Sequence, residues 1–135
     1  MPADSETRVP IVHEGDIVSA RQKGRELAVQ AGFSASELTL IATAISEVAR
    51  NIVVYATSGE ISLGLREQQG RRGIEIVASD QGPGIPNIAL AMQDGYSTKR
   101  SLGLGLPGSR RIMDDFHITS EVGRGTVITM IKWAR

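Results

Sequence analysis

The sequence predicts an α+β fold, a two-layer sandwich with helices on one face of a mixed, mostly antiparallel sheet. Two segments in the first half of the chain carry apolar residues at helical spacing. Two pairs of later segments alternate apolar and polar residues around short glycine-containing turns, which is typical of antiparallel hairpins. With 135 residues, 41% of them apolar, the chain suits a single domain covering residues 1–135.

The composition argues against several classes of protein. Fifteen basic and fifteen acidic residues give a net charge of zero, so no overall field favours nucleic acid or an anionic membrane. The absence of cysteine excludes disulfides and thiolate metal sites. The polar N-terminal segment lacks the apolar core of a signal peptide, and no uninterrupted apolar run approaches the roughly 20 residues that cross a bilayer. We therefore expect a cytoplasmic protein.

The first expected elements are a short strand and a helix. Residues 1–7 are expected to form a flexible tail, and residues 8–13 are rich in β-branched residues, which predicts a strand. Residues 16–31 predict a helix that stops at Gly32. Gly24 weakens this prediction because glycine is unfavourable inside a helix.

The second helix has the strongest pattern in the chain. Ser34 and Glu37 have the spacing of a capping box, in which each side chain binds the backbone of the other residue. The apolar residues that follow at helical spacing are Leu38, Ile41, Ala42, Ile45, Val48, Ala49 and Ile52. The pattern predicts a helix as far as about Tyr55.

The remainder of the chain predicts two hairpins separated by a loop-rich region. Residues 61–65 and 74–78 form the first pair of strands, and residues 116–122 and 126–133 form the second. In the region between them, residues 87–92 predict a short helix. Residues 106–115 predict a longer helix with proline in its first turn, where the missing N–H costs little.

Glu47 and Asn51 are the first candidates for chemistry. They lie four residues apart, so they share one face of the second helix, beside its apolar stripe. A carboxylate and an amide oxygen at this spacing could hold a hard cation and activate a hydroxyl group. Taken alone, the pair is more typical of a solvated helix face on which Arg50 pairs with Glu47.

Asp80 and the glycines after it form a second candidate. Asp80 follows an apolar strand and could accept a hydrogen bond from a ligand amino group, while Gly82 and Gly84 allow close approach of the backbone. The alternative is an ordinary turn. Thr126, which opens the last strand, could bond a base or a carboxylate such as Asp80, or be a plain strand residue.

The third candidate is the glycine-rich stretch SLGLGLPG at residues 101–108. It immediately precedes a predicted helix, and backbone N–H groups in such a loop can bind phosphate with help from the helix dipole. Lys99 and Arg100 lie just before it and could reach a polyphosphate. The alternative is a flexible surface loop.

The order of these motifs is more specific than any one of them. With ISEVARN, DQGPG, GLGLG and a final GT, the chain resembles the GHKL ATP-binding superfamily of the Bergerat fold. This superfamily includes histidine-kinase catalytic domains, gyrase-type ATPases and bacterial anti-sigma kinases. The stretches ATAISEVARNIVVYA and GLGLPGSRRIMDDF are similar to small stand-alone serine kinases that act in bacterial stress signalling.

The resemblance implies a serine kinase that uses ATP and Mg²⁺, with the nucleotide between the helices and the sheet. Asn51 would bind Mg²⁺, and Glu47 would act as the general base toward an incoming serine hydroxyl. Asp80 would bond the adenine amino group, with Gly82 and Gly84 in the pocket and Thr126 supporting that contact.

The resemblance also implies how the phosphates are held. Lys99 or Arg100 would be the cation of a mobile lid. The backbone N–H groups that would face the phosphates belong to Gly103, Leu104, Gly105 and Leu106.

The resemblance further implies protein partners. The expected substrate is a serine of a STAS-domain antagonist protein or of its stressosome scaffold relative, and a PP2C-type phosphatase would be activated by partner switching. An alternative is an anti-sigma factor that sequesters a sigma subunit and phosphorylates its antagonist. His13 and His117 fall in predicted strands and are expected to be structural, so the substrate would be supplied by another chain. A homodimer is possible.

Overall fold

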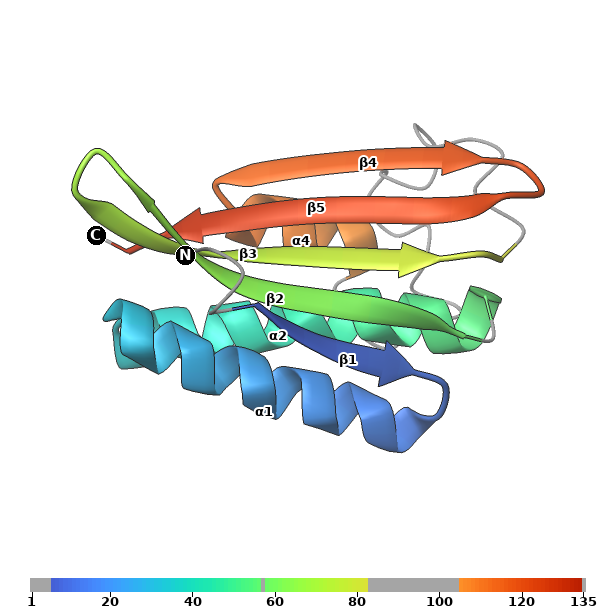
Figure 1. Ribbon diagram of the computed structural model, residues 1–135, viewed down its shortest axis with the longest axis horizontal. Coiled ribbons are helices and arrows are strands. Elements are labelled where there is room, and N and C mark those ends of the chain that lie inside the picture. The colour runs from blue at the N-terminus through green and yellow to red at the C-terminus, as the bar shows by residue number, and fades with distance from the viewer. Residues whose placement is uncertain (1–5, 57, 83–104, 135) are drawn as a thin grey trace.

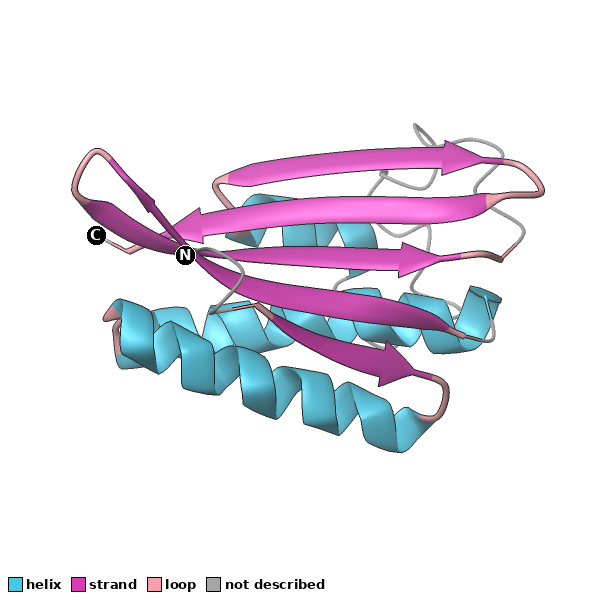
Figure 2. Ribbon diagram, viewed as in Figure 1, coloured by secondary structure: helices cyan, strands magenta, loops and turns pink. Residues whose placement is uncertain are grey.

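The computed structural model describes residues 6–56, 58–82 and 105–134. In chain order the elements are β1 (Thr7–Ile11), α1 (Glu14–Ala31), α2 (Ala35–Asn51), the π-helix η2 (Ile52–Ala56), β2 (Gly59–Gln68), β3 (Arg71–Asp80), α4 (Gly105–Ile112), β4 (Asp115–Glu121) and β5 (Gly125–Trp133). The helices and strands form separate layers (Figures 1 and 2). The predicted α+β sandwich is confirmed.

The five strands form one sheet in the order β1-β2-β3-β5-β4. Both predicted hairpins are present, as the pairs β2–β3 and β4–β5. The hairpins are joined where β3 pairs with β5, which places the last strand beside the middle of the sheet (Figure 1). Every pairing among the described strands is antiparallel, so the sheet is antiparallel there and not mixed.

One face of the sheet is buried beneath the helices, and alternate residues of each strand supply it. The apolar strand residues buried in the core are Val9, Ile11, Ile61, Leu63, Ile74, Ile76, Ala78, Ile128 and Met130. They form one core with the buried stripe of α2, which includes Ile41 and Ile45. A Cβ added at Gly24 of α1 would collide with the Ile45 side chain, so this glycine permits the close packing of α1 on α2.

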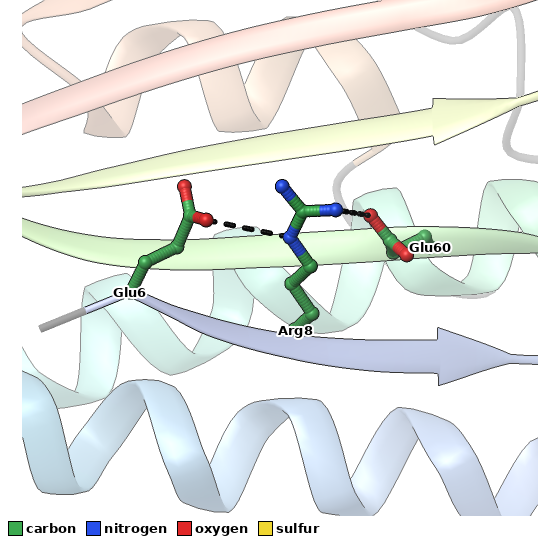
Figure 3. Close-up of polar contacts among 3 residues, drawn as sticks. All are labelled: Glu6, Arg8 and Glu60. Carbon is green, nitrogen blue, oxygen red and sulfur yellow. Dashed lines mark hydrogen bonds and ion pairs between the residues drawn. The ribbon is translucent and has the colours of Figure 1, made fainter. Parts of the chain in front are cut away.

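The opposite face carries polar and charged residues. On it, Arg8 of β1 lies between Glu6 and Glu60, with nitrogen–oxygen distances of 3.3 and 3.8 Å (Figure 3). Such exposed pairs add little stability. Pro10 lies in β1 at the edge of the sheet, where a residue without an N–H is tolerated and discourages pairing with another strand.

The junction between β1 and α1 differs from the prediction. The Asp16 carboxylate accepts hydrogen bonds from the backbone N–H groups of Val12 and His13, at 2.8 and 3.0 Å. These bonds start α1 at Glu14, two residues before the predicted start, and leave His13 as its N-cap. The strand therefore ends at Ile11, and the placement of His13 in a strand is wrong.

The start of α2 is confirmed and its end is corrected. Glu37 N–H donates to Ser34 Oγ at 3.3 Å, and Ser34 N–H donates to the Glu37 carboxylate at 3.0 Å, which completes the predicted capping box. The α-helix ends at Asn51, and the chain continues as the π-helix η2. The prediction of an α-helix to about Tyr55 is therefore wrong about the kind of helix after Asn51. Single π-helical turns are often found at functional sites.

The stretch Ala35–Ala56, which joins α2 and η2, has 22 residues and is long and apolar enough to cross a membrane by length and composition alone. It is not an uninterrupted apolar run. In the fold, Ile41, Ile45 and Ile52 are buried in the core. This is the ordinary behaviour of a central helix in a folded domain.

The second half of the chain contains one described helix. It spans Gly105–Ile112 and not the predicted residues 106–115, because Asp115 already begins β4. The short helix predicted for residues 87–92 lies outside the described residues.

Candidate active site

Several candidate residues meet at the end of the sheet where β3 ends and β5 begins. Asp80, the last residue of β3, pairs with Thr126 on one side and with Gly59 of β2 on the other. The π-helix η2 leads from Asn51 to this same end of the sheet and packs against β2 and β3. The carboxyl end of α2 and the end of β3 are therefore brought together, as Figure 1 shows.

The Asp80 carboxylate is held in a fixed orientation. Its Oδ1 atom accepts hydrogen bonds from the backbone N–H groups of Gly82, at 2.9 Å, and Thr126, at 3.3 Å. The predicted link between Thr126 and Asp80 is thus made by the backbone. The Thr126 hydroxyl lies 2.9 Å from the hydroxyl of Ser120. A half-buried carboxylate fixed by two N–H groups is suited to accept a hydrogen bond from a ligand.

Glycines allow the backbone segments to approach closely at this end. A Cβ at Gly82 would lie 2.7 Å from Cα of Ala56, and one at Gly59 would lie 2.9 Å from Cγ2 of Ile52. Since real Cβ atoms do not come so close, these two glycines let η2 pack onto the turn after β3. The role of Gly59 in this close packing was not predicted from the sequence. The only sign of it there is a glycine at the start of a strand.

Glu47 and Asn51 lie one turn apart on α2. Glu47 is only 4% exposed, and its Oε1 lies 3.6 Å from a guanidinium nitrogen of Arg50. The alternative interpretation, a solvated helix face on which Arg50 pairs with Glu47, is correct about the ion pair. It is wrong about the exposure of the Glu47 carboxylate, which is buried. Buried glutamates are rare without a paired charge, and Arg50 supplies one here. Asn51, the last residue of α2, is half-buried beside it.

Gly105 and Leu106, two of the predicted phosphate-binding residues, open α4, which packs against α2. The first N–H groups of any helix have no partner within that helix, so they can bind an anion. Four consecutive residues near this helix start are buried: Leu106, Pro107, Gly108 and Ser109. The other predicted residues of this group, together with Gly84 of the pocket, lie outside the described residues: Gly84, Lys99, Arg100, Gly103 and Leu104.

The site residues fit a nucleotide-bound metal better than one held by protein alone. Within residues 6–56, 58–82 and 105–134, no group of three or more His, Cys, Asp or Glu side chains could hold an ion. Mg²⁺ commonly needs only one or two protein oxygens when phosphate oxygens and water supply the others. The side-chain oxygen of Asn51 is suited to that role.

Comparisons with known proteins agree with this architecture. Residues 13–132 match the family described as histidine kinase-like ATPase domain. The chain is 50% identical over 127 residues to the serine/threonine-protein kinase RsbT of Bacillus subtilis (strain 168), covering 94% of this chain and 96% of that protein. It is 32% identical over 101 residues to an anti-sigma F factor of Clostridium kluyveri, covering 71% and 70% of the two chains.

A solved structure supports the fold. The crystal structure of the RsbU and RsbW domains of Rv1364c from Mycobacterium tuberculosis matches with a TM-score of 0.64 at 17% identity. The match covers 96% of this chain and 33% of that longer one. The predicted resemblance to bacterial anti-sigma and stress-signalling kinases is confirmed, and the chain belongs to the family of histidine kinase-like ATPase domains.

Proposed function

We propose that this chain is a serine/threonine-protein kinase that transfers the γ-phosphate of ATP to a serine of another protein. Its similarity to RsbT over nearly the whole length supports the proposal. The structural observation that carries it is the buried Glu47 one helical turn from Asn51, on a helix that continues into η2. This π-helix packs against β3, the strand that ends at Asp80. ATP binding alone would not require an acid at the position of Glu47.

Glu47 is proposed as the general base. A carboxylate within hydrogen-bond reach of a serine hydroxyl can accept its proton as the bond to phosphorus forms. The Arg50 guanidinium, 3.6 Å from Glu47 Oε1, orients this carboxylate and compensates for its burial. Phosphoryl transfer depends mainly on positioning and charge neutralisation, so a single well-placed base is sufficient.

The other side chains are proposed to hold the nucleotide. Asp80, fixed by the N–H groups of Gly82 and Thr126, would accept a hydrogen bond from the adenine amino group. Asn51 would bind Mg²⁺, which when bound neutralises charge on the phosphates. Residues 103–106 would donate backbone N–H groups to phosphate oxygens, and Lys99 or Arg100 would add a positive charge.

Similarity to a stress-signalling kinase also suggests the partners. We place the protein in the cytoplasm, with a STAS-domain antagonist or scaffold protein as its substrate and a PP2C-type phosphatase as a second partner. The similarity to an anti-sigma F factor favours sigma-factor sequestration as the second candidate function. Affinity capture with purified partners separates the two: binding of a phosphatase supports the first, and binding of a sigma subunit supports the second.

The main test measures binding and transfer separately. The protein is incubated with γ-labelled ATP, Mg²⁺ and a STAS-domain protein, and nucleotide affinity is measured in parallel. We expect Glu47→Gln to keep ATP affinity and to lose transfer by about a hundredfold or more. We expect Asn51→Ala to weaken Mg²⁺–ATP binding itself.

Glu26→Gln is the matched control, because Glu26 is exposed on α1. It should change neither affinity nor transfer. Full transfer by Glu47→Gln would eliminate the proposed base. Absence of ATP binding by the unmodified protein would contradict the kinase proposal as a whole.

A further inference from the structure

Lys132 is a buried charged residue that the proposed chemistry does not use. It lies on β5 two residues after Met130 and four after Ile128, so it points to the helix-covered face of the sheet. It is 7% exposed, and lysine is almost never buried without a partner. Its ammonium group donates a hydrogen bond to the carbonyl oxygen of Ile112, at 2.9 Å.

This contact fixes the carboxyl end of α4. Ile112 is the last residue of α4, and the last carbonyl groups of a helix have no partner within it. The negative end of the helix dipole is also at this position, so a lysine there stabilises the helix in two ways. The ammonium therefore both satisfies an acceptor and neutralises partial charge.

Two further hydrogen bonds join Asp114, two residues after the end of α4, to β5. Asp114 N–H donates to the carbonyl oxygen of Ile131 at 3.0 Å, and Trp133 N–H donates to the Asp114 carboxylate at 2.7 Å. Three consecutive residues of β5 thus hold the carboxyl end of α4 and the residues directly after it. The opposite end of α4 is at Gly105 and Leu106, and the helix packs against α2.

We propose that Lys132 is a positioning residue for the nucleotide phosphates and acts through α4. This rests on the proposed function, in which Gly105 and Leu106 donate backbone N–H groups to phosphate. With eight residues, α4 is about 12 Å long and has only two turns, so it moves as one piece. Fixing its carboxyl end therefore sets the position of its amino end.

The test compares ligands with and without phosphates. Lys132→Met keeps most of the side-chain length and removes the donor and the charge. We expect the affinity of this variant for ATP to fall roughly tenfold, which is the size of effect typical of losing one hydrogen bond from a charged group. Its affinity for adenosine, which has no phosphates, should stay unchanged. The KM for ATP should rise by the same factor, with kcat at saturating ATP within about twofold of the original. Lys132→Arg, which keeps a charged donor, should restore most of the ATP affinity.

Lys23→Met on the exposed side of α1 is the matched control and should leave both affinities unchanged. If circular dichroism shows that Lys132→Met does not fold, Lys132→Gln is measured in its place. This variant keeps an N–H donor but no charge, so we expect an intermediate loss of affinity for ATP and no change in affinity for adenosine. Equal losses for ATP and adenosine, or none for either, would overturn the role of Lys132. An unmodified protein that binds ATP no better than adenosine would overturn the proposed phosphate site as well.

Discussion

The two helices beside the candidate site, α2 and α4, are held in place by different means. α2 begins with a capping box and buries a continuous apolar stripe, so the signals that define it lie within its own sequence. α4 has eight residues, too few for a stable isolated helix, and its carboxyl end is bound to β5 residues 19 and 20 positions away in the chain. The side of the site that carries the proposed base is therefore locally specified, and the proposed phosphate side depends on tertiary contacts.

The substitution with the largest expected effect tests whether the buried apolar stripe of α2 stabilises the fold. Ile41 is fully buried at the centre of the core, and Ile41→Ala removes three methyl or methylene groups there. We expect a loss of about 2–5 kcal/mol in the free energy of unfolding, measured by urea denaturation. Val29→Ala on the exposed side of α1 is the control and should change stability by less than about 0.5 kcal/mol. A small effect of Ile41→Ala would mean that α2 does not organise the core.

The next largest effect is expected from a substitution that tests whether α4 depends on its contacts with β5. Asp114→Ala removes the acceptor for Trp133 N–H and should cost about 1–3 kcal/mol. Hydrogen exchange should show this loss in the amides of α4 and at Trp133, with those of α2 still protected. Asp115→Ala, at the exposed neighbouring position, is the control. Equal loss of protection in α2 and α4 would contradict the claim that the two helices are stabilised separately.

A smaller effect concerns the start of α2. Ser34→Ala removes the side-chain acceptor of Glu37 N–H and should reduce the free energy of unfolding by about 1 kcal/mol. Ser34→Asp keeps an acceptor and should be close to neutral. Thermal or urea denaturation distinguishes the variants. If Ser34→Ala is also neutral, the local capping box does not contribute to the stability of α2.

The smallest effect concerns the start of α1 and acid pH. Hydrogen bonds from the backbone N–H groups of His13 and Val12 lower the pKa of Asp16 below its ordinary value of 3.8. The ionised carboxylate therefore stabilises the fold above pH 3.8, and this contribution is lost as the pH falls through the lowered pKa. Asp16→Asn should make unfolding slightly less dependent on pH below 3.8. Identical acid titrations of the two proteins, followed by circular dichroism, would contradict this.

The parts of the fold that were predicted correctly are those with local signals. Ser34 and Glu37 mark the start of α2 by themselves, and the alternating strands mark both hairpins. The π-helical turn after Asn51 was not predictable from spacing, because it occurs where Ile52 and Ala56 pack against Gly59 and Gly82. Similarly, the pairing of β3 with β5 joins two hairpins that each look self-sufficient in the sequence.

The same distinction applies to the candidate site. The shared face of Glu47 and Asn51 follows from their spacing, but the burial of Glu47 depends on the packing of the helix layer. The contact of Asp80 with Thr126 was anticipated through a hydroxyl and is made by a backbone N–H, whose direction depends on strand register. Lys132 did carry a signal, because a lysine in phase with Ile128 and Met130 indicates a buried partner.

The antiparallel pairing of β3 with β5 has a consequence for the order of folding. Asp80 and Thr126 are 46 residues apart, whereas each hairpin closes over a few residues. The entropy lost on closing a loop grows with its length, so the hairpins are expected to form before the two strands join. Pulse-labelling during refolding should protect the amide of Val77, which faces Ser62 in the first hairpin, ahead of that of Thr126, which faces β3. Any help that nucleotide gives to refolding would then come only in the last step.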